Sequence, residues 1–221
     1  MRRLLLVLAV ITVLPVQAAK PVPQRGSLTD GGPSVSFDGQ FIVASAATRN
    51  DVLYAAGIEL RGSPYGLGVE TRMASATVGA DGVARLDMTA PITVRSVWVV
   101  VDARGGYTIS PGPGMARREM DVSTAGSVTG HDGQVRGLTL QRSSVFVFLV
   151  RPAVGMWSLR LVDGRMNDDD KTFNGMVSVA FQELQPAAGT IPPAPDHLVP
   201  GDVLFVVDPY SLDYAVTRQA K

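Results

Sequence analysis

The strongest constraint on the fold is a run of large apolar side chains at residues 144–162, SVFVFLVRPAVGMWSLRLV. Residues 145–150 form an unbroken apolar segment, rich in β-branched and aromatic side chains and too short for a membrane helix, which is typical of a strand buried on both faces. Residues 151–155 interrupt the run. Apolar and polar residues then alternate over 156–161, the pattern of a strand with one buried face. The stretch therefore predicts a central β-hairpin.

Short β-branched or alternating segments occupy much of the remaining chain, and Gly, Asp and Pro separate them. Gly-containing pairs at residues 81–82, 105–106 and 132–133 tolerate the positive φ angles of tight hairpins. No long amphipathic helix pattern is present. We therefore predict an all-β, antiparallel β-sandwich of two sheets, jelly-roll or immunoglobulin-like. The main expected strands are residues 35–37, 41–47, 52–60, 67–73, 83–88, 92–101, 107–109, 135–140, 176–181, 203–207 and 214–217.

Two segments of the chain resemble each other. Residues 98–109 contain WVVVD followed by YTI, and residues 204–216 contain LFVVD followed by YAV. An ancient duplication and two convergent hairpins both explain this similarity, so one sandwich or two small sandwiches remain open. We expect the chain to divide into a flexible N-terminal arm (19–34), a β-sandwich (35–185), a Pro-rich connection (186–201) and a C-terminal hairpin (202–221).

One local pattern resembles a known family. The segment GMWSLRLVD at residues 155–163 has the form G-x-W-x-L-x-x-x-D. It is similar to a strand of the jelly-roll P-type domains that accompany secreted proteases, and of similar bacterial accessory sandwiches. The resemblance covers about nine residues and implies a sandwich fold. It implies no catalytic residues.

The first residues have the features of a secretory signal peptide. Arg2 and Arg3 precede an apolar core at residues 4–13, and residues 16–18 suit a signal peptidase. We expect cleavage after Ala18 and a periplasmic or extracellular protein. The apolar core is too short to span a bilayer of roughly 30 Å, and no later segment approaches that length. We therefore expect no transmembrane segment after cleavage of residues 1–18.

Charge and cysteine content exclude several classes of function. The chain has 20 basic and 20 acidic side chains, so it lacks the basic surface that nucleic acids attract. It has no Cys, which excludes disulfides and thiolate metal sites. The sequence also lacks the G-x-S-x-G and H-E-x-x-H motifs of common hydrolases. Its two histidines, His131 and His197, are predicted in loops without a catalytic partner.

Carboxylate pairs remain as candidate catalytic groups, because glycosidases take them from separate strands. Glu59 and Glu70 are predicted on outward-facing positions of neighbouring strands, where they face each other. We interpret them as solvated surface carboxylates, and a carboxylate-dependent hydrolase or lyase is the alternative. Trp98 and Trp157 lie in apolar strands and are expected to anchor the core. The tyrosines are interpreted as ordinary residues of strand edges and turns, and a stacking platform for a carbohydrate is the alternative. The tyrosines of that platform are Tyr54, Tyr65, Tyr107, Tyr210 and Tyr214.

An Asp-rich segment follows the predicted central hairpin. Calcium binds six to eight oxygens from carboxylates, amides and carbonyls, and residues 163–175 offer the densest supply of them. The segment lacks the spacing of an EF-hand. A solvated loop and a calcium site are both compatible with this composition. If calcium binds, the expected ligands are Asp163, Asp168, Asp170 and Asn174.

The sequence thus predicts function mainly by exclusion. We expect a secreted or periplasmic, non-enzymatic β-sandwich module that binds a protein or glycan partner in the bacterial envelope. The alternative is a secreted carboxylate-dependent hydrolase or lyase acting on polysaccharide. No certain cofactor is expected, and calcium is the candidate.

Overall fold

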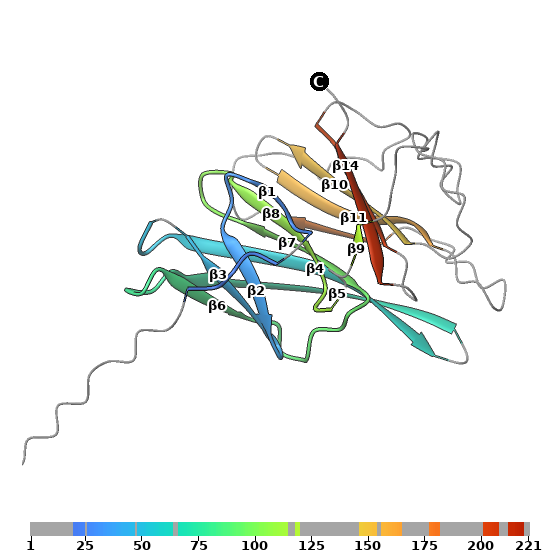
Figure 1. Ribbon diagram of the computed structural model, residues 1–221, viewed down its shortest axis with the longest axis horizontal. Helices are drawn as coiled ribbons and strands as arrows, with labels where there is room; N and C mark the ends of the chain where they lie inside the picture. The colour runs from blue at the N-terminus through green and yellow to red at the C-terminus, as the bar shows by residue number, and fades with distance from the viewer. Residues whose placement is uncertain are drawn as a thin grey trace, which may run out of the picture.

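The computed structural model describes residues 20–24, 26–46, 48–63, 66–114, 118–119, 146–153, 156–164, 177–181, 201–207 and 212–218. In this part of the chain it has 14 β-strands and no helix (Figure 1). The strands are β1 (Leu28–Asp30), β2 (Ser34–Asp38), β3 (Phe41–Ser45), β4 (Val52–Ser63), β5 (Gly66–Thr77), β6 (Val83–Asp87), β7 (Ser96–Val101), β8 (Tyr107–Pro111), β9 (Arg118–Glu119), β10 (Phe146–Ala153), β11 (Met156–Gly164), β12 (Val177–Phe181), β13 (Val203–Val207) and β14 (Asp213–Arg218).

The strands form three sheets. Sheet A has the order β1-β8-β7-β4-β5, sheet B the order β2-β3-β6, and sheet C the order β12-β11-β10-β13-β14-β9. Every strand pairing is antiparallel except the two-residue pairing of β14 with β9. Sheet A lies between sheets B and C (Figure 1). The predicted antiparallel, all-β sandwich class is confirmed, with three layers where the sequence suggested two.

The larger core fills the space between sheets A and C. Alternate residues of β4 and β7 point toward alternate residues of β10 and β13, as the period-two geometry of strands requires. Burial of each large side chain contributes about 1.5 to 3 kcal/mol. The buried residues of this core are Ala56, Ile58, Leu60, Val97, Val99, Val101, Tyr107, Ile109, Phe146, Phe148, Val150, Leu159, Leu161, Val203, Phe205, Val207 and Tyr214.

A second core lies between sheets A and B. It contains Trp98, which is fully buried, so the predicted core role of this residue is confirmed. Trp98 pairs with Gly57 on β4, and a Cβ atom on Gly57 would lie 2.1 Å from the indole ring. Glycine is therefore required beneath the ring. The remaining buried residues are Val35, Ile42, Ala44, Leu53, Ala55, Val78, Ala84, Leu86, Met88, Ile92 and Val100.

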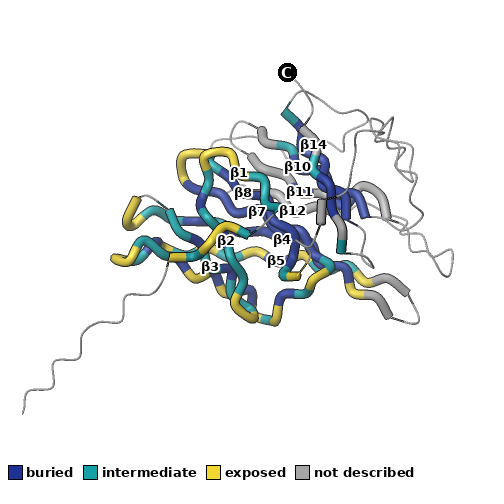
Figure 2. Tube along the Cα trace, in the orientation of Figure 1, coloured by how far each residue is buried: buried dark blue, intermediate teal, exposed yellow. Residues whose placement is uncertain are grey.

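The centre of the molecule differs from the sequence prediction. The hairpin predicted at residues 144–162 is present as β10 and β11, and residues 146–150 are buried on both faces as expected. It belongs to sheet C, however, whereas the middle layer is sheet A. All six residues of β7 are buried, and Figure 2 shows β4 and β7 as the buried interior. Both cores depend on sheet A, because it contributes a face to each of them.

Three local predictions are corrected. The sequence predicted an interruption at residues 151–155, but strand β10 continues through Pro152. Pro152 lacks an N–H group, and this costs no hydrogen bond to β13 because β13 pairs with β10 only as far as Val150. Strand β7 begins at Ser96 rather than Ile92, whose N–H donates to the carbonyl of Gly39. The N-terminal segment, predicted to lack regular structure, contains β1, which pairs with β8.

Sheets A and C each contain a four-strand unit of the same topology. The first unit has the order β5-β4-β7-β8, and the second has the order β11-β10-β13-β14. In each unit the last residue of the third strand in sequence pairs with a buried tyrosine, as Val101 with Tyr107 and Val207 with Tyr214. The similarity of the two sequence segments therefore extends to their strand order and register.

Candidate functional site

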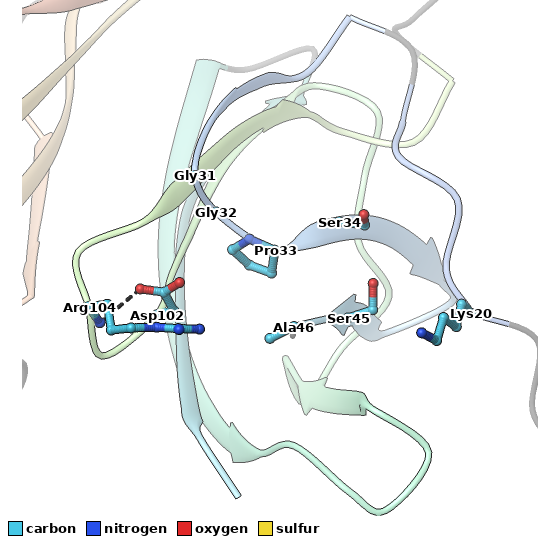
Figure 3. A pocket seen from close by; sticks show the side chains of 9 residues that line it. All are labelled: Lys20, Gly31, Gly32, Pro33, Ser34, Ser45, Ala46, Asp102 and Arg104. Carbon is cyan, nitrogen blue, oxygen red and sulfur yellow. Dashed lines mark hydrogen bonds between the residues drawn. The ribbon is translucent and has the colours of Figure 1, made fainter. Parts of the chain in front are cut away.

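The described part of the chain contains a polar cavity of about 300 Å³ beside sheets A and B. The N-terminal arm, the adjoining ends of β2 and β3, and the turn between β7 and β8 surround it (Figure 3). We call it the Asp102 cavity. It is lined by Lys20, Gly31, Gly32, Pro33, Ser34, Ser45, Ala46, Asp102 and Arg104.

The turn after β7 fixes the carboxylate of Asp102. Its Oδ1 atom accepts hydrogen bonds from the N–H groups of Arg104, at 2.8 Å, and Gly106, at 2.9 Å. The residue is only 4% exposed, and its own N–H donates to the carbonyl of Gly106. The carboxylate therefore closes its own turn through one oxygen. Because the turn is held in this way, Asp102 is a rigid part of the cavity wall.

The N-terminal arm reaches the cavity because a glycine permits a close backbone contact. A Cβ atom on Gly32 would lie 2.1 Å from the carbonyl carbon of Tyr107. The hydroxyl of Thr108 then donates to the carbonyl of Pro33 at 2.6 Å. Gln24 also donates from Nε2 to the carbonyl of Gly112 at 3.1 Å. These contacts join the arm to β8 and position the start of β2 over the cavity.

Besides Asp102, four polar side chains of the cavity are placed to bind a ligand, namely Lys20, Ser34, Ser45 and Arg104. Lys20 forms no ion pair, and the hydroxyls of Ser34 and Ser45 form no hydrogen bond, with any described residue. Arg104 has a 3.4 Å contact with Asp51, and exposed pairs of this kind contribute little. In Figure 3, Lys20 and Arg104 approach the cavity from opposite sides. The cavity therefore offers two cations and two hydroxyls beside one carboxylate.

A second polar cluster is closed to solvent. The carboxylate of Glu59 is completely buried and forms an ion pair with Arg72, while its Oε1 atom accepts from the N–H of Thr93 at 2.7 Å. Arg72 also donates to the carbonyls of Met88 and Ala90 and lies over the ring of Trp98, 5.4 Å from its centroid. The cluster fastens the β6–β7 connection to sheet A. It has no free carboxylate to offer a substrate.

The predicted pairing of Glu59 with Glu70 is confirmed by the strand register, but the outward position of Glu59 is wrong. The sequence pattern predicted that only one face of β4 is buried. In the structure the connection between β6 and β7 also covers the other face, at Glu59. Arg61 lies between the two carboxylates, 3.8 Å from Glu59 and 2.6 Å from Glu70. An ion-paired, buried Glu59 gives no support to a catalytic carboxylate pair.

The remaining predicted site residues fall largely outside the described ranges. Asp163 pairs with Val147 in the β10–β11 hairpin, and its side chain is not described. The other expected calcium ligands, Asp168, Asp170 and Asn174, lie outside the described residues, as do His131 and His197. The side chain of Trp157 is likewise not described. Among the described residues, no group of three or more His, Cys, Asp or Glu is placed to hold a metal ion.

The predicted tyrosine platform is not formed by Tyr54, Tyr107 and Tyr214, and Tyr65 and Tyr210 lie outside the described residues. Tyr107 and Tyr214 are buried in the core between sheets A and C, and Tyr54 packs against that core. Sequence reasoning missed Lys20 and Asp102 as cavity residues. The available signal was the Asp-x-x-Gly-Gly turn at residues 102–106, since an Asp in such a turn commonly accepts bonds from the following N–H groups.

Comparison with protein-family models, curated proteins and solved structures finds no match to this chain. A search of the described residues for a helix long and apolar enough to cross a membrane also finds none.

Proposed function

We propose that this protein is an exported binding module of the bacterial envelope, and that the Asp102 cavity binds the terminal residue of an anionic glycan. The cavity chemistry carries the proposal. Unpaired Lys20 suits a carboxylate or phosphate group, and the hydroxyls of Ser34 and Ser45 suit sugar hydroxyls. The carboxylate of Asp102 is an acceptor for a further ligand hydroxyl. The volume of about 300 Å³ is at the small end of ligand sites, which suits one sugar residue.

Binding is a better interpretation of this cavity than glycoside hydrolysis. Hydrolysis usually requires two carboxylates about 5 to 10 Å apart. Asp102 is the one carboxylate among the described residues that line the cavity, and its Oδ1 atom is already bonded to two backbone N–H groups. The alternative of a carboxylate-dependent enzyme has no specific observation in its favour here.

The binding proposal is tested by titrating uronic-acid oligosaccharides and their neutral counterparts into the protein by calorimetry. Charge-assisted hydrogen bonds contribute about 1.5 to 3 kcal/mol, so Lys20→Gln and Arg104→Gln should each weaken acidic-glycan binding by roughly 10- to 100-fold. Arg85→Gln is the matched control, because Arg85 is an exposed arginine of sheet B that does not line the cavity. Equal binding of neutral and acidic glycans, or equal losses in all three variants, would refute the proposal.

Export is tested separately. The pattern at residues 1–18 supports cleavage after Ala18, which would leave the amino terminus one residue before Lys20 of the cavity. Mass spectrometry of protein from the native host should detect a chain that begins at Ala19. A chain that retains Arg2 and Arg3 would contradict export.

A further inference from the structure

Strand β5 is an unusually long sheet edge. The edge strands of the three sheets are β1 and β5, β2 and β6, and β12 and β9. β5 has 12 residues, whereas none of the other five has more than five. No strand among the described residues pairs with the outer edge of β5. A long edge of this kind presents unpaired N–H and C=O groups that favour pairing with another strand.

The sequence of β5 lacks the usual protection of an edge. Its 12 residues contain no Lys and no Pro, and its register with β4 continues from one end to the other without a bulge. Along one face, Thr71, Met73, Ser75 and Thr77 are exposed, and Met73 reaches 47% exposure. The exposed face is therefore uncharged.

The two charged residues of β5 are already occupied on its other face. Arg72 is buried against Glu59, and Glu70 forms an ion pair with Arg61 at 2.6 Å. Neither charge is available to repel an approaching strand on the Met73 face. The length, regularity and neutral face of β5 favour β-strand addition at this edge.

We propose that β5 pairs with β5 of a second copy of this chain, antiparallel and centred on Met73. Such an interface is isologous and closes as a two-fold dimer. In this register Thr71 lies opposite Ser75 of the second copy, a favourable cross-strand pair. Arg72 and Glu70 lie opposite Ala74 and Ala76 of the second copy, so no like charges meet. A centre at Arg72 would instead place two guanidinium groups together.

The experiment is sedimentation of the purified protein over a range of concentrations, with Met73 changed in both charge directions. Met73→Lys and Met73→Glu each place like charges opposite one another at the two-fold axis, and each should weaken the dimer at least tenfold. Mixing the two variants should restore a heterodimer, because lysine then faces glutamate. Val94→Lys is the control, since Val94 is an exposed apolar residue outside β5.

Each outcome decides the proposal. Concentration-dependent dimerisation that is lost in both single variants, retained in Val94→Lys and recovered on mixing would support pairing through β5. A wild-type protein that stays monomeric up to hundreds of micromolar would overturn it. A dimer that is unaffected by Met73→Lys would also overturn it, because the interface would then lie elsewhere. Circular dichroism of each variant ensures that the comparison is made between folded chains.

Discussion

The two four-strand units share their strand order but fill equivalent positions differently. In the first unit Gly57 pairs with Trp98, and in the second Leu149 pairs with Leu204. One large ring above a glycine thus replaces two side chains of medium size. Cores tolerate such exchanges when the total volume is kept. The comparison shows that strand order and register are common to the units, while the side chains at equivalent positions differ.

The same ends of the two units contain buried charges with different partners. In the first unit Glu59 pairs in register with Ser96 and takes its counter-ion, Arg72, from the neighbouring strand β5. In the second unit Arg151 occupies the position of Glu59, and Asp202 binds it through two hydrogen bonds of 2.8 and 2.7 Å. Both solutions neutralise a charge where the pairing of the two central strands of the unit ends, as burial requires.

The largest effect is expected from removing the counter-ion of the first unit. Arg72→Met should remove the buried counter-ion of Glu59, leaving only the half-exposed Arg61 at 3.8 Å, and also release the carbonyls of Met88 and Ala90. Loss of one partner of a buried pair costs about 3 to 5 kcal/mol. Urea unfolding followed by tryptophan fluorescence measures the change in the free energy of unfolding.

A double variant separates charge burial from packing. If the cost of Arg72→Met arises from the stranded carboxylate, then Glu59→Met combined with Arg72→Met should be less destabilised than Arg72→Met alone. A double variant as unstable as the sum of the two single variants would show that the pair is not coupled.

A smaller loss is expected in the second unit. Arg151 is part-exposed, with 15% of its side chain accessible, so water can partly compensate Asp202 when the guanidinium is removed. Arg151→Met should therefore cost about 1.5 to 3 kcal/mol, the range for hydrogen bonds to charged groups. The same urea experiment measures it. A loss larger than that of Arg72→Met would reverse the proposed ranking of the two ion pairs.

Most of the local fold was accessible from the sequence. Alternation predicted β4, and the Gly-containing pairs at residues 81–82 and 105–106 predicted two of the turns, because these signals depend only on neighbours in the chain. The third layer was not predicted. Whether a strand is covered on one face or two depends on segments distant in sequence, such as the contact of β4 with the connection before β7.

The candidate site was harder to predict because it too depends on segments that are distant in sequence. The cavity joins Lys20, Ser45 and Asp102, which lie on three separate segments. No spacing rule links them, and each residue alone is ordinary. Glu59 was selected correctly as one half of a pair with Glu70, but its burial follows from Arg72 and Thr93 rather than from the pattern of β4 itself.

A third prediction tests the exchange of volume between the units. Gly57→Ala places a methyl group where the ring of Trp98 lies, so it should destabilise the protein by about 1 to 3 kcal/mol. Adding Trp98→Leu removes the ring and makes room for the methyl group. The double variant should then lose at least 0.5 kcal/mol less than the sum of the single losses, the usual lower limit of coupling between contacting residues. Thermal unfolding measures all four proteins, and strict additivity would reject the exchange.

The smallest expected effect concerns the connections that follow β5 and β11. After β5 the chain reaches β6 through residues 78–82, whereas after β11 the Asp-rich segment of residues 165–176 precedes β12. The sequence leaves a solvated loop and a calcium site as alternatives for this segment. The expected ligands of a calcium site are Asp163 near the end of β11 and Asp168, Asp170 and Asn174 in the connection, because their oxygens are the ligands that calcium prefers.

Calcium at tenfold excess over its dissociation constant should stabilise the folded state by about 1.4 kcal/mol. For a chain of this size that corresponds to roughly 3 to 6 °C in the unfolding midpoint. The measurement is thermal unfolding in calcium against chelator, for the wild type and for Asp168→Ala and Asp170→Ala. Both substitutions should abolish the shift, because each removes an expected carboxylate ligand of the ion. Identical wild-type midpoints up to several millimolar calcium would leave the segment without a metal. A shift that survived both substitutions would assign the ion to another part of the molecule.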